Sequence, residues 1–467
     1  MTRIAGLLLT APLAGFALEA ALGAGGFQLH LRAWGATLVV AGGATLVALA
    51  LGLPAGAALA HSRRSLPRAL TLFPLLLPPV LGAAAWLAAR LPVPGAPGCA
   101  VILGALYWPV VALLLDASLR RLPADAVESA SLQLTPRQTL AAIVWPHARP
   151  ALLAAALIVF LLAASEFTVP ALFVVPTISM TVYEEMSAFR GASAASAALP
   201  LVALAVALAW MLRRTPALPA ASPVRPFLGA SSLRIIRAAA ALVWGATALL
   251  PALLFALRAG SFFKTAAMNL EAIGWSVLVA GATSLLLVAW SSMAPPGRSR
   301  LEPVWLATLV LPGVVAGLGA LKIAEYSGLL PYVAPSGALL VLSLMARFAF
   351  VAWLPLREPV GRSQIEAAEL SGLSRFQVWR RIRLPAMLPR AAAAGAVVFV
   401  LARGEIGPAV LLSPPGRMTE AQHLFNLMHY GYDGVVASLA LLLFGATALI
   451  TWGAMNVGRF RTDRLAG

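Results

Sequence analysis

The charged side chains Glu166, Arg347 and Glu405 lie inside otherwise apolar stretches of this 467-residue sequence. Charges within apolar segments are costly and commonly mark the path of a solute or ion. Glu166 and Glu405 each lie 20 residues after a loop proline, so they occupy equivalent positions in two related segments. Two interpretations are open: the carboxylates form an acidic gate for a cationic substrate, or they are interfacial groups held by Arg403 or by solvent. Arg347 is expected to pair with a carboxylate or to line a wet cavity.

Other patterns that carry catalysis or metal binding are absent from the sequence. The single cysteine, Cys99, excludes a C-x-x-C pair, and the five histidines are scattered. A phosphate-binding loop needs G-x-x-x-x-G-K-[ST], but the two lysines, Lys264 and Lys322, follow Phe and Leu. We therefore expect no catalytic residue, no metal and no cofactor in this chain, and a membrane-embedded enzyme is disfavoured.

Composition indicates which elements must hold these charges. The sequence is 61% hydrophobic and 11% charged, far below the roughly 25% charged residues of a soluble domain. Apolar runs of about 20 residues, long enough to span a bilayer, recur along the whole chain. They predict an all-α polytopic membrane protein with about twelve transmembrane helices. Single spans are expected over residues 69–89, 151–174, 303–324 and 391–412, among others.

The net charge of +17 would suggest nucleic acid in a soluble protein. Here the arginines cluster in alternate loops between apolar spans, where they set the topology and face lipid headgroups. We therefore expect membrane lipid and no nucleic acid as a partner. The arginine bias also predicts a multi-pass protein of the bacterial inner membrane with both termini in the cytoplasm.

The two halves of the sequence resemble each other. TLVVAGGATL from Thr37 parallels SVLVAGATSL from Ser276, LLPPVLG parallels VLPGVVAG, and several such pairs lie 239 positions apart. A Pro- and Arg-rich stretch at 213–237 is expected to be a cytoplasmic linker. We predict a first repeat over 1–212 and a second over 238–467, each of about six helices and in the same orientation.

The cytoplasmic loop between the fourth and fifth spans of the second half reads IEAAELSGLSRFQVWRRIRLPAMLPR. A short helix from Glu366 can end at Gly372, because glycine accepts the left-handed conformation of a helix C-terminus. A second helix then begins with the capping box Ser374-x-x-Gln377. Its apolar residues Phe376, Trp379 and Ile382 are expected to share a face.

The first half repeats this loop as VESASLQLTPRQTLAAIVWPHARP. Glu128, Ser129 and Ala130 stand where the other loop has Glu-Ala-Ala. The copy is one residue shorter and lacks the glycine, but Thr135 and Gln138 supply an equivalent capping box.

These loops resemble the EAA loop of binding-protein-dependent ABC importer permeases, and two in one chain resemble the fused permeases of iron(III) and thiamine importers. In the second loop the matching residues are Glu366, Ala367, Ala368, Gly372, Trp379, Ile382, Leu384 and Pro385, and in the first Glu128, Ser129, Ala130 and Pro146. The resemblance implies a coupling helix in each loop and two copies of a separate cytoplasmic ABC ATPase that binds ATP. It also implies a periplasmic substrate-binding protein as a partner. Iron(III) is the favoured substrate, ahead of thiamine or a phosphonate-like solute.

The alternative is a secondary active transporter, which also commonly has two related halves. Such a protein needs a coupling-ion site, for which Glu166, Glu405 and Arg347 are the candidates. It gives no reason for two capped helices in matching cytoplasmic loops.

Overall fold

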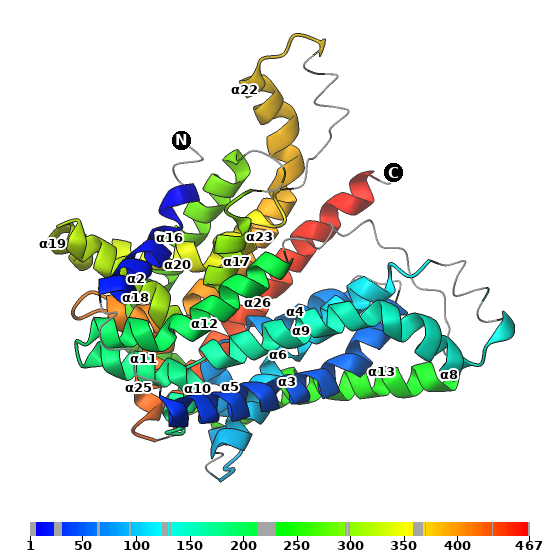
Figure 1. Ribbon diagram of the computed structural model, residues 1–467, viewed down its shortest axis with the longest axis horizontal. Helices are drawn as coiled ribbons and strands as arrows, with labels where there is room; N and C mark the ends of the chain where they lie inside the picture. Colours follow the sequence, from blue (N-terminus) through cyan, green and yellow to red (C-terminus); the bar gives the residue numbers. More distant parts are fainter. Residues whose placement is uncertain are drawn as a thin grey trace.

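A computed structural model of the protein describes residues 6–22, 30–62, 66–92, 95–123, 129, 132–212, 230–294, 297, 299–357, 368, 370–431 and 433–465. The regular elements of these residues are helices, which confirms the expected all-α polytopic fold (Figure 1). The first half contributes α2 (Ala11–Leu22), α3 (Leu31–Ala60), α4 (Leu66–Leu76), α5 (Pro79–Ala88), α6 (Gly95–Leu119), α8 (Pro136–Thr139), the π-helical turn η2 (Leu140–Val144), α9 (Trp145–Ser165), α10 (Thr168–Leu172), α11 (Ile178–Ser187) and α12 (Gly191–Leu212).

The second half repeats this order with few changes. It contributes α13 (Ala230–Trp244), the π-helical turn η3 (Gly245–Leu249), α14 (Leu250–Arg258), α15 (Phe262–Met268), α16 (Leu270–Met293), α17 (Glu302–Val310), α18 (Gly313–Tyr326), α19 (Leu330–Val333), the 3₁₀ turn η4 (Ala334–Ser336), α20 (Ala338–Trp353), α22 (Arg375–Val378), the π-helical turn η5 (Trp379–Arg383), α23 (Leu384–Gly404), α24 (Gly407–Leu412), α25 (Glu420–Met428) and α26 (Gly434–Leu465). Residues 230–237, expected to be irregular linker, are helical. The division into repeats at 213–237 otherwise stays a prediction.

Eight helical runs in the described part of the chain are long and apolar enough to cross a membrane, and three bent helix pairs raise the number to as many as eleven. The expected twelve are therefore not all found there. Helix α2 has 12 residues, about 18 Å at 1.5 Å per residue, which is short of a full span.

Two of the expected spans, 69–89 and 303–324, each consist of two helices joined at a sharp bend. Helices α4 and α5 meet at 81°, and α17 and α18 at 118°. Both breaks fall at a Leu-Pro pair, Leu77–Pro78 and Leu311–Pro312. Proline disfavours the α conformation of the residue before it, and Leu311 is accordingly extended, with ψ 155°.

Helices α3 and α6 form the centre of the first half. A Cβ on Gly52 would lie 2.6 Å from Cβ of Val111, and one on Gly104 would lie 2.5 Å from Cβ of Val47. Small residues of this kind let membrane helices approach closely. In the most apolar part of α6, 78% of the residues are buried, against 22% in the most apolar part of the run 231–258, which contains α13 and α14. Helix α6 is thus a core helix, whereas α13 and α14 lie at the periphery.

The first helix of each half packs on the other half. Helix α2 lies along α18, while α13 contacts α3 and α14 contacts α5. Between α13 and α14, Thr247 Oγ1 of η3 accepts a hydrogen bond of 3.2 Å from Trp108 Nε1 of α6. One cluster of buried apolar side chains contains residues of both halves, including Phe16 and Leu318. The two halves therefore fold around a shared core.

The contact between α2 and α18 depends on two glycines. A Cβ on Gly15 would collide with the Gly319 carbonyl, and a Cβ on Gly319 would collide with the Pro12 carbonyl. Beside them, Lys322 Nζ lies 3.4 Å from Glu19 Oε1. Backbone-to-backbone packing leaves no room for even a methyl group at this crossing.

We predict that Gly319→Ala lowers the unfolding temperature of the purified chain, because the added methyl forces α2 and α18 apart. Overpacking of this kind costs about 1–3 kcal/mol. The control is Gly42→Ala on α3, where a Cβ meets nothing within 4 Å. Equal unfolding temperatures for the two variants would contradict the close packing.

Candidate functional site

Glu166 and Glu405 end two equivalent helices. Helices α9 and α23 each have 21 residues and start 239 positions apart, at Trp145 and Leu384. Each helix stops at its glutamate, which is extended, with φ/ψ of −79°/125° for Glu166 and −81°/121° for Glu405. The expected continuous spans 151–174 and 391–412 are thus broken at these residues. The breaks place both carboxylates at helix ends rather than on helix faces.

Arg347 binds Glu405. Its Nε lies 3.0 Å from Glu405 Oε2, and the two side chains are 12% and 18% exposed. The same guanidinium donates to the carbonyl oxygen of Leu311, at the break between α17 and α18. The prediction that Arg347 pairs with a carboxylate is therefore confirmed. Arg403, which one of the two interpretations expected to hold Glu166 and Glu405, instead pairs with Glu420.

Glu166 completes a charged cluster with this pair. Its Oε1 accepts a hydrogen bond of 2.8 Å from the backbone N–H of Thr168, at the start of α10. Electrostatic interactions link Glu166 to Glu405 and to Arg347, and Tyr107 on α6 to all three. No sequence pattern points to Tyr107, because a tyrosine in an apolar span is ordinary. We call Tyr107, Glu166, Arg347 and Glu405 the central cluster.

The central cluster lies where the two halves meet. Ser165 Oγ, at the end of α9, donates to the Val310 carbonyl of the other half at 2.6 Å. The equivalent end of α23 touches the first half, since a Cβ on Gly404 would collide with the Pro78 ring. Each long helix thus ends against the proline break of the opposite half. This reciprocal arrangement brings the two glutamates toward the interface.

The second half carries an additional buried ion pair. Arg403 on α23 binds Glu420 on α25, and their side chains are 7% and 1% exposed. The Glu420 N–H also donates to Ser276 Oγ at 2.5 Å. Burial raises the pKa of Glu420 above its usual range, while the charge of Arg403 acts in the opposite direction.

The first half keeps the backbone of this arrangement without its charges. Ile178 N–H, at the start of α11, donates to Thr37 Oγ1 at 2.9 Å, just as Glu420 N–H donates to Ser276. Position 164, 239 residues before Arg403, is alanine. An Ala–Ile pair therefore stands where the second half has Arg–Glu.

Both predicted docking loops contain their capping boxes. The Ser374 N–H donates to Gln377 Oε1 at 2.9 Å, and the Gln377 N–H donates to Ser374 Oγ at 3.3 Å. The Thr135 N–H makes the same 2.9 Å bond to Gln138. Gly372 has a φ of 76°, and the Leu373 N–H donates to the Ala368 carbonyl at 3.2 Å. The expected glycine helix end is therefore confirmed.

A π-helical turn joins each docking loop to its long helix. The turns η2 and η5 begin 239 positions apart, at Leu140 and Trp379. Such turns are rare in proteins, and many of those that occur lie at functional sites. The sequence pattern predicted a regular helix here, and the wider turn changes the angle between Trp379 and Ile382. Phe376 and Trp379 still stack, with ring centroids 6.2 Å apart.

The docking loops lie at the periphery of the molecule. Figure 1 shows α22 and α8 beyond the helix bundle, at two separate places. Phe376 is 65% exposed and Leu140 is 46% exposed. In the second loop Arg383 donates to the Ala294 carbonyl at 2.9 Å. In the first loop His147 Nε2 lies 3.0 Å from the backbone carbonyl oxygen of Ser118. Each loop is thus fixed to its own half while apolar side chains remain open.

The other predicted loop residues are divided between described and undescribed parts of the chain. Ser129, Pro146, Ala368, Ile382, Leu384 and Pro385 are described, whereas Glu128, Ala130, Glu366 and Ala367 lie outside the described residues. Ala368 is buried at 7% exposure. The role of these residues in docking stays a prediction. Within the described residues, no three His, Cys, Asp or Glu side chains gather in a way that could hold a metal ion.

The fold and site define a polytopic α-helical membrane protein whose halves meet at a charged centre. No protein-family model matches the chain. It is 27% identical over 200 residues to the provisionally named 2-aminoethylphosphonate transport system permease protein PhnV of Salmonella paratyphi A, covering 39% of this chain and 74% of that protein. PhnV of Salmonella typhimurium and of Salmonella choleraesuis are 26% identical with the same coverage. The homologues are thus transport permease subunits.

We predict that Arg403→Ala destabilises the chain by about 3–5 kcal/mol, because it leaves Glu420 buried without a partner. Glu420 can take up a proton and lose its charge in this variant, so the loss of stability should be closer to about 3 kcal/mol than to about 5. The double variant Arg403→Ala with Glu420→Ile copies the Ala164 and Ile178 pair of the first half, so it should recover wild-type stability. Denaturant unfolding of the purified chain measures both. A double variant as unstable as the single one would show that this site requires the charges.

Proposed function

We propose that the protein is the permease subunit of an ATP-binding-cassette importer, which forms the translocation path and couples it to cytoplasmic ATPases. The pair of equivalent docking loops carries this proposal. Both loops have a capping box, a π-helical turn and exposed apolar residues, and the two turns begin 239 positions apart. An exposed amphipathic helix of this kind suits a groove on a partner protein. Two loops imply two ATPase copies, which bind the ATP.

The long helices offer a direct route from ATPase to substrate path. The runs 137–165 and 376–404 each have 29 residues, or about 43 Å at 1.5 Å per residue. One end of each run lies in a docking loop. The opposite end of each run stops next to Glu166 or Glu405. A rigid helix displaced at its docking end moves its other end as well. Closure of the ATPases would therefore change the spacing of the two glutamates.

The central cluster favours a substrate that carries both signs of charge. Glu166 can attract an ammonium group, and Arg347, although paired with Glu405, can attract an anionic group. A 2-aminoethylphosphonate-like zwitterion has both groups, and the relatives are named for its transport. We therefore propose an aminophosphonate as the substrate in place of iron(III) or thiamine. A periplasmic binding protein would deliver it at the side opposite the docking loops.

The coupling proposal predicts that Glu366→Arg with Trp379→Ala removes most ATPase from the purified complex. Trp379→Ala alone is expected to weaken binding of the ATPase to the chain by roughly 30-fold, the effect of losing a contact of about 2 kcal/mol. Leu140→Ala is the matched change in the first, shorter loop and should have the smaller effect. Co-purification from cells that express the chain with candidate ATPases measures all three. Transport by the chain alone in proteoliposomes would contradict the proposal and favour a secondary transporter.

The substrate proposal predicts that Glu166→Gln lowers ATP-driven uptake of 2-aminoethylphosphonate by about tenfold or more, the effect of losing one hydrogen bond to a charged group. Uptake of methylphosphonate, which lacks the ammonium group, should change little. Glutamine keeps the acceptor for the Thr168 N–H. The control is Glu185→Gln, which affects a carboxylate bound to Arg190 at 2.6 Å, outside the central cluster. ATP-driven uptake of iron(III), without uptake of any phosphonate, would overturn the substrate proposal.

A further inference from the structure

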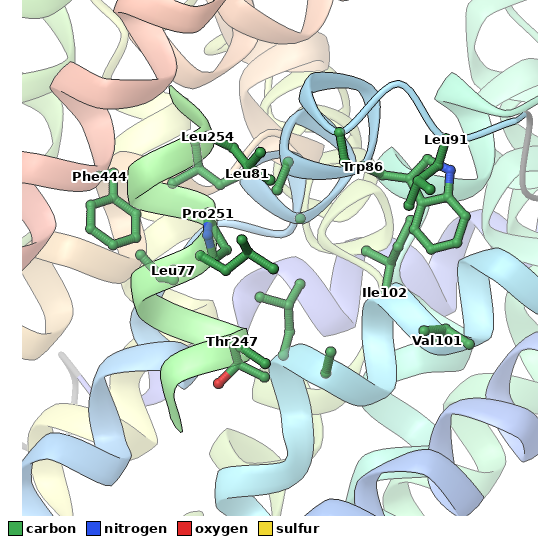
Figure 2. A pocket seen from close by; sticks show the side chains of 17 residues that line it. Leu77, Leu81, Trp86, Leu91, Val101, Ile102, Thr247, Pro251, Leu254 and Phe444 are labelled. Atoms are coloured by element: carbon green, nitrogen blue, oxygen red, sulfur yellow. The ribbon is translucent and has the colours of Figure 1, made fainter. Parts of the chain in front are cut away.

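A cavity of about 180 Å³ lies where the first helical run of the second half crosses the first half. Figure 2 shows Leu81 and Trp86 of α5, Ile102 of α6, and Leu254 of α14 around it. Phe444 of α26 closes one side. The walls therefore come from both halves of the chain.

The cavity offers nothing to a polar ligand. Thr247 Oγ1 already donates to the Val243 carbonyl at 2.9 Å and accepts from Trp108 Nε1 at 3.2 Å. Trp86 Nε1 donates to the Pro92 carbonyl at 2.9 Å. The remaining lining side chains are apolar. A water molecule needs two to four polar partners, and an apolar cavity of about 150 Å³ stays dry and binds benzene. The occupant that fits is a hydrocarbon.

The sequences of the two halves explain why the two crossings are packed differently. Pro12, Gly15 and Phe16 of α2 correspond to Pro251, Leu254 and Phe255 of α14, each 239 positions later. The seventh residue after the helix-breaking proline is Gly319 in α18 and Ala85 in α5. Glycines at both positions let α2 lie directly on α18. Leucine and alanine hold α14 away from α5, and both line the resulting space.

The rim of the cavity is continuous with the lipid-facing surface. Leu91, Val101 and Leu250 line the cavity and are 46%, 45% and 48% exposed. Val101 and Leu250 belong to helical runs that are long and apolar enough to span a membrane. Exposed leucines next to Leu250, such as Leu249 and Leu253, extend the same surface. The opening therefore lies on an exposed apolar surface of the kind that faces bilayer hydrocarbon.

We propose that the cavity holds one acyl chain of a membrane phospholipid, which fills the gap between α14 and α5. The chain takes the place of the glycine contact that closes the other crossing. A lipid bound there joins the two halves at this crossing.

Quenching of Trp86 by brominated lipid tests this proposal. The full chain is reconstituted in nanodiscs of phosphatidylcholine with dibrominated acyl chains, and the emission of a Trp86→Phe variant is subtracted to isolate Trp86 from the other eleven tryptophans. Trp86 should be strongly quenched in the wild type. Ala105→Phe, which fills the cavity from α6, should lose most of this quenching. Ala289→Phe on the exposed face of α16 adds the same bulk elsewhere and should not.

A second variant and a second measurement guard against a folding defect. Ala85→Leu fills the cavity from the opposite wall and should have the same effect as Ala105→Phe. Native mass spectrometry should then find one phospholipid fewer on both filled variants than on the wild type and Ala289→Phe. Equal quenching and equal lipid retention in all of these proteins would overturn the proposal.

Discussion

The backbone groups exposed at helix breaks are the constraint on which this structure depends. Inside a bilayer each carbonyl must find a donor within the protein, so irregular backbone is tolerated only where it is buried in protein or lines a cavity. The breaks after α9, α17 and α23 all lie where the halves meet. Ser165 satisfies the Val310 carbonyl, and Arg347 satisfies the Leu311 carbonyl. Meeting these needs brings a guanidinium and two carboxylates together, so the requirement for hydrogen bonds also builds the candidate substrate path.

The two halves share a backbone plan but differ in chemistry. The hydroxyl that accepts from Ile178 N–H in one half accepts from Glu420 N–H in the other. The charges around that bond, however, occur only in the second half. The helix crossings differ in the same way, because Gly15 permits direct backbone contact and Leu254 leaves a cavity. Two halves of one chain can diverge like this, since each half always meets the same partner.

The position of the π-helical turns connects the docking loops to the centre. Each turn lies between a capped helix and a long helix, and each loop is tied to a neighbouring span by Arg383 or His147. These ties fix the loop relative to its own half. In the proposed importer, force applied to an exposed loop would therefore reach the buried cluster through the long helix of the same half.

The sequence by itself determined the helical membrane fold, the doubled order of elements, the capping boxes and the helix end at Gly372. These features follow from apolar run length and from local hydrogen bonds, which nearby residues decide. The equivalent positions of Glu166 and Glu405 were also evident from spacing alone. Only the tertiary structure decided that Arg347 binds Glu405, that Arg403 binds Glu420 and that Tyr107 joins the cluster. Those contacts depend on bends at Leu-Pro pairs and on the crossing of the halves, and such long-range packing leaves no periodic trace in the sequence.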